Sequence, residues 1–172
     1  MMEAITARGP ILKWLPDFLF RSDGNKLAYI GKAWLLALLP SIALSMLANT
    51  LSSVLVPGQA GPDIQADTPT LFVLLVLVGP LLESIIMGGA LLALTRWLGP
   101  ARAVVASAVL WGVAHSLASP IWGLVFWWPF LVLSAVFLTW RGGGFWLGVG
   151  MATAVHGLQN ATAGVALLAG LG

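Results

Sequence analysis

The sequence contains no cysteine, which excludes disulfide bonds and thiolate metal ligands. Charged residues are also scarce: Asp, Glu, Lys and Arg make up 8% of the 172 residues, whereas about a quarter is usual in soluble domains. Hydrophobic residues instead make up 59%. No soluble core could bury so much apolar sequence, so the composition predicts an integral membrane protein, and the length suits one compact domain.

Two further features are missing. The segment before the first apolar run carries scattered charges, so we expect no cleavable signal peptide and expect the first spanning helix to direct insertion. No basic patch is interleaved with aromatic residues, so nucleic acid is not an expected partner. The expected partner is the lipid bilayer.

Five apolar runs predict an all-α fold, an integral membrane bundle of about five transmembrane helices. The runs cover residues 33–56, 70–95, 103–118, 121–140 and 144–168. A spanning helix needs roughly 20 residues, so the third run is short, and we expect it to tilt or to begin inside the protein. A loop at 57–69 separates the first two runs, and we expect it to be solvated.

The basic residues predict one orientation of this bundle. All eight Lys and Arg residues lie before the first run, between the second and third, or between the fourth and fifth, whereas the loop at 57–69 holds Asp63 and Asp67. With the N-terminus in the cytoplasm, every basic residue falls on the cytoplasmic side, as the positive-inside rule requires. We therefore expect residues 1–32 to form a cytoplasmic or interfacial segment and residues 33–172 to form the transmembrane domain.

The segment before the first run has one apolar face. One side of a helix would hold Ile11, Leu12, Leu15, Phe18 and Leu19. This spacing predicts an interfacial helix on the cytoplasmic leaflet. Pro16 fits such a helix only in its first turn or at a kink, so an irregular amphipathic arm is an equal alternative.

Three ionisable residues lie inside the apolar runs: Glu83, His115 and His156. A charged residue there costs about 2.5–3.5 kcal/mol on insertion scales, and such residues usually face a bundle interior or a wet cavity. Each lies thirteen to fifteen residues from the arginine that marks the cytoplasmic end of its helix. This separation is roughly 20 Å along a helix, and the shared depth predicts one common site.

Helical spacing places further residues beside these three. His156 and Asn160 lie one turn apart on a stripe of small residues, which let helices pack closely. Met87 shares a stripe with Glu83. Taken singly, each polar residue has a structural alternative: a buried histidine is most often a hydrogen-bond partner, Glu83 could be a neutral carboxylic acid, and Asn160 could join two helices.

One carboxylate, two imidazoles and one amide together suit hydrolysis. Glu83 could act as a general base toward water, while the imidazoles and the amide could donate hydrogen bonds to a developing oxyanion. In a second route, Glu83, His115 and His156 could hold a divalent metal such as zinc, with a position open for water. The residues alone do not choose between these routes. A proton or metal carrier ranks last, because few polar residues could line a path across the membrane.

Three segments, "PLLESIIMGG", "WGVAH" and "HGLQN", resemble the membrane motifs of the CPBP family. This family comprises CAAX-type prenyl-protein endopeptidases and bacteriocin-processing or immunity (Abi) proteins. Its pattern is a Glu-Glu-x-x-x-Arg helix, an aromatic-x-x-x-His helix and a His-x-x-x-Asn/Asp helix. Glu83 matches the first glutamate, Trp111 and His115 match the second motif, and His156 and Asn160 match the third.

The resemblance implies an intramembrane endopeptidase in a bacterial plasma membrane, acting on a peptide or membrane-protein substrate. Glu83 with His115 would then activate water, and His156 with Asn160 would stabilise the oxyanion. A metal-dependent mechanism is equally compatible with the family.

Two positions depart from the family pattern. Ser84 stands in place of the second glutamate, and Gly88 in place of the arginine. Residues at i and i+4 of a helix can pair, so the joint loss leaves no unpaired charge, and we expect the fold to survive. The loss also favours the alternative function, a non-catalytic CPBP-like scaffold or immunity protein that binds another membrane protein.

Overall fold

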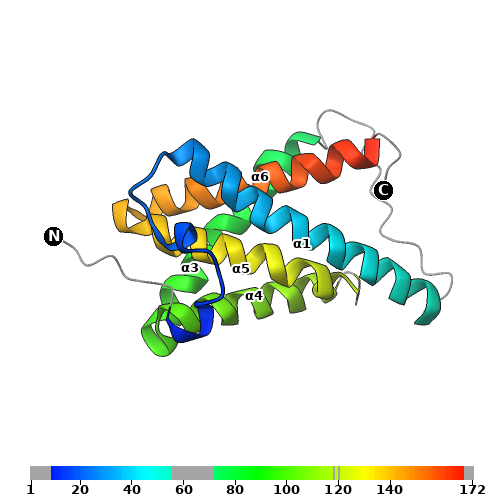
Figure 1. The fold of residues 1–172 in the computed structure, drawn as a ribbon, viewed down its shortest axis with the longest axis horizontal. Coiled ribbons are helices and arrows are strands. Elements are labelled where there is room, and N and C mark those ends of the chain that lie inside the picture. Colours follow the sequence, from blue (N-terminus) through cyan, green and yellow to red (C-terminus); the bar gives the residue numbers. More distant parts are fainter. Residues whose placement is uncertain (1–8, 56–71, 118, 120, 169–172) are drawn as a thin grey trace.

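The chain folds as a bundle of α-helices, shown in Figure 1. The computed structural model describes residues 9–55, 72–117, 119 and 121–168, and this part of the chain contains no β-strand. The long helices are α1 (Lys26–Leu55), α3 (Gly79–Leu98), α4 (Pro100–Ser116), α5 (Trp122–Trp140) and α6 (Phe145–Leu168). The predicted all-α membrane bundle is confirmed. The loop predicted at 57–69 lies outside the described residues.

Three stretches of the described chain are long and apolar enough to cross a membrane. They are Lys26–Val54 in α1, Leu74–Leu98 ending in α3, and Gly123–Gly143 in and just after α5. Helix α4 has only 17 residues, as its short apolar run predicts. Helix α6 has 24 residues and carries three polar side chains in its second half, those of His156, Gln159 and Asn160. Neither α4 nor α6 is among these three stretches, and both bear residues of the candidate site.

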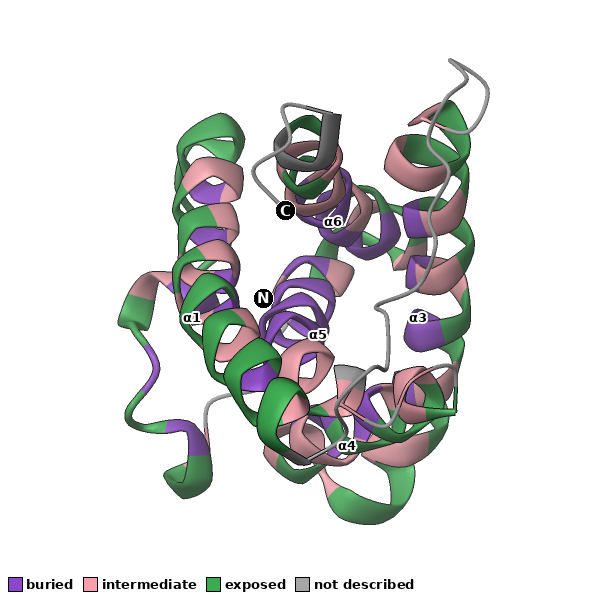
Figure 2. Ribbon diagram, turned by 90° about the vertical axis from the view of Figure 1, so that its right-hand side faces the viewer, coloured by how far each residue is buried: buried purple, intermediate pink, exposed green. Residues whose placement is uncertain are grey.

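Helix α5 forms the centre of the bundle. Every residue from Trp128 to Leu138 is buried, and α1, α4 and α6 pack around this helix (Figure 2). A helix that is apolar on all sides is usually buried in a protein core or spans a membrane, and α5 is buried by its neighbouring helices. Since α5 contacts both α4 and α6, it sets the distance between His115 and His156.

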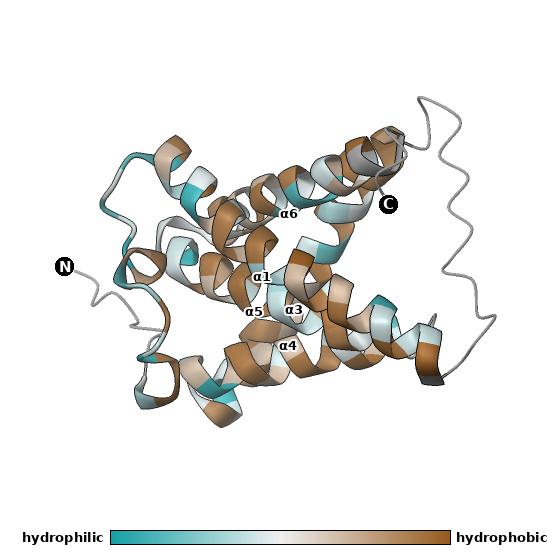
Figure 3. Cartoon of the chain, turned by 45° about the vertical axis from the view of Figure 1, so that its right-hand side comes forward, coloured by the Kyte–Doolittle hydropathy of each residue, from teal (hydrophilic) through white to brown (hydrophobic). Residues whose placement is uncertain are grey.

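Apolar residues dominate the helices (Figure 3), and many large ones lie on the outer surface of the bundle. Leu39 on α1, Ile86 on α3 and Val113 on α4 are each more than half exposed. A soluble monomer rarely exposes so much contiguous apolar surface. In a bilayer these faces contact acyl chains, which is consistent with an integral membrane protein.

The N-terminal segment is an irregular arm that packs on the bundle. It holds two short 3₁₀ turns, η1 (Pro10–Leu12) and η2 (Asp17–Phe20), with Pro16 between them. Leu12, Leu15 and Leu19 are fully buried. The irregular alternative is therefore the one that the chain adopts, and these three leucines pack on the bundle.

Helix α1 begins earlier than its apolar run predicts. Asn25 precedes the helix, and its side-chain Oδ1 accepts a hydrogen bond from Ala28 N at 3.1 Å. An asparagine in this position is a favourable N-cap because it satisfies a free N–H of the first turn. The basic residues Lys26 and Lys32 thus belong to the first helix and not to the segment before it.

Candidate active site

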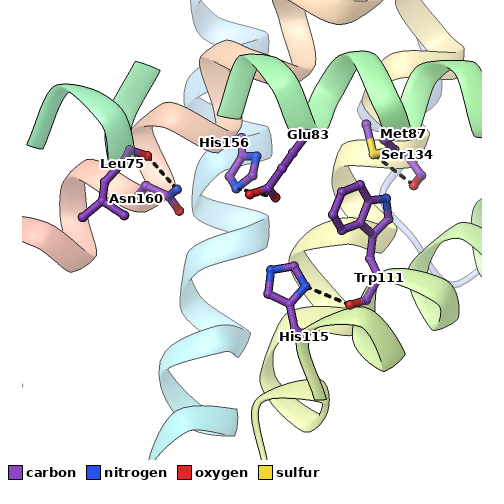
Figure 4. A network of polar contacts seen from close by, with 8 residues as sticks. All are labelled: Leu75, Glu83, Met87, Trp111, His115, Ser134, His156 and Asn160. Carbon is purple, nitrogen blue, oxygen red and sulfur yellow. Dashed lines mark hydrogen bonds and ion pairs between the residues drawn. The ribbon is translucent and has the colours of Figure 1, made fainter. Parts of the chain in front are cut away.

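Four helices approach one another around Glu83. The side chain of Glu83 extends from α3, His115 from α4, and His156 and Asn160 from α6, while α5 lies behind them (Figure 4). Helix α3 follows η3 (Leu74–Val78), a π-helical turn. In α6, Gly148, Ala152 and His156 are buried, so the stripe of small residues faces protein as predicted.

The carboxylate of Glu83 points toward the imidazole of His156. Glu83 Oε2 lies 3.9 Å from His156 Nε2 (Figure 4). The His156 side chain is 6% exposed and that of Glu83 is 31% exposed, so the pair is reached from the Glu83 side. Glu83 Oε2 and His156 Nδ1 are both buried without a hydrogen-bond partner. Buried polar atoms normally have partners, so each exception calls for an explanation, and a catalytic role is one.

His115 is oriented by its own helix. Its Nδ1 lies 2.8 Å from Trp111 O, one turn earlier in α4. A carbonyl oxygen only accepts, so Nδ1 carries the proton and Nε2 keeps its lone pair in the neutral ring. The ring also stacks on Phe126, with centroids 4.3 Å apart. This arrangement leaves Nε2 as the nitrogen that can accept a proton or orient a water molecule.

Phe130 lies between the two histidines, and no pattern in the sequence distinguishes it from the other aromatic residues nearby. The centroid of its ring lies 5.3 Å from that of His115 and 5.4 Å from that of His156. Trp111 also stacks on it, with ring centroids 4.4 Å apart and nearly parallel planes. The two imidazoles thus pack on one buried aromatic ring from the central helix.

Asn160 does not meet Glu83. Its Nδ2 donates a hydrogen bond to Leu75 O in η3 at 2.9 Å (Figure 4). The amide therefore joins α6 to the segment that precedes α3. The structure brings Glu83 and His156 into contact, places His115 beside them through Phe130, and gives Asn160 a backbone partner.

The comparisons with known proteins give one match. A family model described as "Type II CAAX prenyl endopeptidase Rce1-like" matches residues 65–162, more than half of the chain. The chain belongs to the Rce1-like family. No curated protein and no solved structure matches the chain. Membership of the Rce1-like family confirms the predicted CPBP relationship, and the matched residues include all four candidate site residues.

The two departures from the CPBP motif pattern have a structural counterpart in this Rce1-like protein. At Gly88, an added Cβ would lie 2.6 Å from Phe137 Cε2 and 3.2 Å from Phe145 Cε2. Two aromatic rings therefore occupy the space beside the position where the pattern has arginine. Ser84 is buried, and its Oγ has no hydrogen-bond partner. The side of α3 next to Glu83 is thus close-packed and carries no charge.

A second buried polar contact lies deeper in the bundle. Ser134 Oγ on α5 lies 2.9 Å from Ser107 Oγ on α4 and 3.5 Å from Met87 Sδ on α3 (Figure 4). Ser134 is the one serine in the apolar helix α5, and this feature of the sequence could have identified it as a buried polar contact. The contact joins three helices of the Rce1-like bundle just beyond the Glu83 pair.

The metal alternative requires three ligands around one point. Glu83 and His156 supply two donors of the types that zinc binds. Among the described residues, however, no group of three His, Asp or Glu side chains is placed to hold a metal ion. The predicted set of Glu83, His115 and His156 therefore does not form a three-ligand cluster among the described residues.

Proposed function

We propose that this Rce1-like protein is an intramembrane endopeptidase that hydrolyses a peptide bond with a water molecule activated by Glu83. One observation supports this most: Glu83 Oε2 and His156 Nε2, from separate helices, lie 3.9 Å apart within the membrane domain. That distance is too long for a direct hydrogen bond. It allows one water molecule to bond to both groups at about 2.8 Å.

The proposed reaction uses three side chains. Glu83 takes a proton from water as the resulting hydroxide attacks the substrate carbonyl carbon. His115 Nε2 orients this water, and His156 donates a hydrogen bond to the oxyanion as it forms. When the carbon–nitrogen bond breaks, Glu83 returns the proton to the leaving amine. We assign the oxyanion donor to His156 alone, because the amide nitrogen of Asn160 points at Leu75 O and not at Glu83.

The substrate class follows from the site's position. Glu83 lies in a span whose outward face is apolar, so the substrate must reach it through or along the membrane. A peptide with a lipid-modified end or a membrane-bound protein meets this requirement. We propose a bacterial plasma membrane as the location, with the N-terminus on the cytoplasmic side, where the positive-inside rule puts the basic residues.

The test is peptide cleavage by the purified protein in lipid nanodiscs. The substrate is an internally quenched peptide with a prenylated C-terminal cysteine, and a second peptide carries an acyl chain. Glu83→Gln and His115→Ala should abolish cleavage while the protein still inserts and folds. Thr162→Val is the matched control, since Thr162 Oγ1 donates only to Leu158 O in its own helix. Full activity in both site variants would show that the proposal is wrong.

A second candidate function is a non-catalytic scaffold or immunity protein that binds another membrane protein. The close packing of Phe137 and Phe145 against Gly88 favours it, because the region has no charge that could hold a polar substrate. In that case a stable partner co-purifies with the chain, and Glu83→Gln leaves this association unchanged. Loss of the association in Glu83→Gln would instead point back to the site.

A further inference from the structure

The helix that carries Glu83 begins with an interruption in its hydrogen bonding. In η3, Gly79 N donates to Leu74 O, which is the five-residue spacing of a π-helix. With that spacing, the donor for Leu75 O would be residue 80, and with α-helical spacing residue 80 would serve Val76 O. Residue 80 is Pro80, which has no N–H. A carbonyl of η3 must therefore find its donor in another element.

Helix α6 faces both of the affected carbonyls. Asn160 Nδ2 donates to Leu75 O at 2.9 Å. Gly157 lies so close to η3 that a Cβ atom there would be 2.7 Å from Val76 O. Any side chain at this position would push η3 away from α6. Close packing of η3 on α6 thus needs both the absence of a side chain at Gly157 and the amide at Asn160.

The same two helices meet again at the candidate site. His156 directly precedes Gly157 in α6 and contacts Glu83, which lies two turns after Leu75 (Figure 4). Two separate points of contact between two helices fix how the helices are rotated and how far they are shifted along their axes relative to one another. The Leu75–Asn160 hydrogen bond and the 3.9 Å pair are thus two polar contacts that hold α3 in register with α6.

We propose that Gly157 and Asn160 form a clamp on η3 that positions Glu83 opposite His156. Asn160 is then a positioning residue that acts through Leu75 O, and it replaces the backbone donor that Pro80 removes. Inside a membrane an unsatisfied carbonyl is costly because no water replaces the lost donor. The effect of the clamp on catalysis rests on the proposed function, whereas the clamp itself does not.

The experiment compares four proteins in nanodiscs: wild type, Pro80→Ala, Asn160→Leu and the double variant. Asn160→Leu removes the donor and keeps the side-chain volume similar. Pro80→Ala restores a backbone N–H that either helical spacing can use. The first measurement is hydrogen exchange of backbone amides in the peptide covering residues 74–83, and the second is peptide cleavage. The matched control is Gln159→Leu, next to Asn160, which has no bond to η3.

Asn160→Leu should speed exchange in this peptide about tenfold, since it leaves a buried carbonyl unpaired. The double variant should return to within about twofold of Pro80→Ala, because the two positions act through one carbonyl. Cleavage, if present, should be lost in Asn160→Leu and recovered in the double variant. Gln159→Leu should change neither measurement. If Asn160→Leu alone does not fold, recovery of folding in the double variant would support the proposal in the same way.

Other results overturn the proposal. Additive effects of Pro80→Ala and Asn160→Leu on exchange would show that the two residues are not linked through Leu75 O. A double variant that does not fold would show the same, since its carbonyl has a backbone donor. If the double variant regains slow hydrogen exchange but not peptide cleavage, Asn160 acts on the reaction directly. If the wild-type protein cleaves no peptide, the proposed function fails, and hydrogen exchange still decides on the clamp.

Discussion

Glu83 on α3 and His156 on α6 face each other at 3.9 Å, and each has a buried polar atom with no hydrogen-bond partner. A purely structural pair in a membrane would be expected to satisfy these atoms, because unsatisfied polar groups are costly there. The pair is instead left open on the side of Glu83, whose side chain is 31% exposed. The arrangement is one in which a water molecule or substrate group completes the hydrogen bonding.

The first prediction separates the two nitrogens of His115. His115→Asn places an amide N–H near the position of Nδ1, so it can still donate to Trp111 O. It removes the nitrogen at the Nε2 position, which the proposed reaction uses. We expect a folded protein whose cleavage rate is about 10²–10⁴-fold lower, the usual contribution of acid–base catalysis. An unchanged rate in the peptide-cleavage assay would remove His115 from the mechanism.

The second prediction concerns two adjacent glycines of α3. Gly88→Ala brings a Cβ to 2.6 Å from the buried ring of Phe137, whereas an added Cβ at Gly89 has no atom within 4 Å. Gly88→Ala should destabilise the protein by about 1–3 kcal/mol through overpacking. Gly89→Ala should be neutral or stabilise it by up to about 1 kcal/mol. Thermal unfolding in detergent measures both.

A rescue variant tests the cause of the Gly88 effect. Phe137→Leu shortens the ring that the new Cβ would meet, so the double variant Gly88→Ala/Phe137→Leu should lose less stability than the two single changes together. Equal unfolding temperatures for Gly88→Ala and Gly89→Ala would show that the ring does not occupy this space. In that case the missing arginine of the family pattern would need another explanation.

The sequence predicted the bundle and the central pair because both depend on local patterns. Apolar runs determine which segments can span, and the scarcity of ionisable groups made Glu83, His115 and His156 stand out. Their shared depth follows from helical rise, and the structure does bring Glu83 to His156. The start of α1 was placed too late because hydropathy does not detect the Asn25 cap.

The remaining features depend on contacts between distant segments. Pro80 was visible in the sequence, but the consequence of its missing N–H depends on Asn160 lying opposite Leu75. Phe130 is one of several aromatic residues in α5, and only packing shows that it contacts both histidines. The irregular N-terminal arm depends on donors ten and 120 residues further along the chain. The pattern of residues within the arm does not predict these donors.

The third prediction concerns the serine contact in the bundle interior. Ser107→Ala or Ser134→Ala leaves the other hydroxyl without its serine partner, which should cost about 1–3 kcal/mol. The double alanine variant removes both polar groups, so its loss of stability should be smaller than the sum of the two single losses. Unfolding in denaturant measures the cycle. Strict additivity would show that the two hydroxyls do not interact.

The fourth prediction concerns the contact that attaches the N-terminal arm to the bundle. Here the loss of stability in the double variant should exceed the sum of the single losses, the opposite of the serine pair. Leu19 O accepts hydrogen bonds from Tyr29 Oη and from Thr139 Oγ1, both at 2.8 Å. Tyr29→Phe or Thr139→Val alone leaves the carbonyl with one donor, so each should cost only about 0.5–1.5 kcal/mol. Both rings that pack on Tyr29, those of Phe18 and Trp140, keep their contacts in Tyr29→Phe.

The double variant leaves the buried carbonyl of Leu19 unpaired. Its loss of stability should therefore exceed the sum of the single losses, and the arm should detach more often from the bundle. Limited proteolysis at Lys13 and Arg21 measures this detachment, since both residues lie in the arm. Cleavage there should rise in the double variant well before the helices unfold. Equal cleavage in the single and double variants would show that buried Leu12, Leu15 and Leu19 hold the arm without the carbonyl contacts.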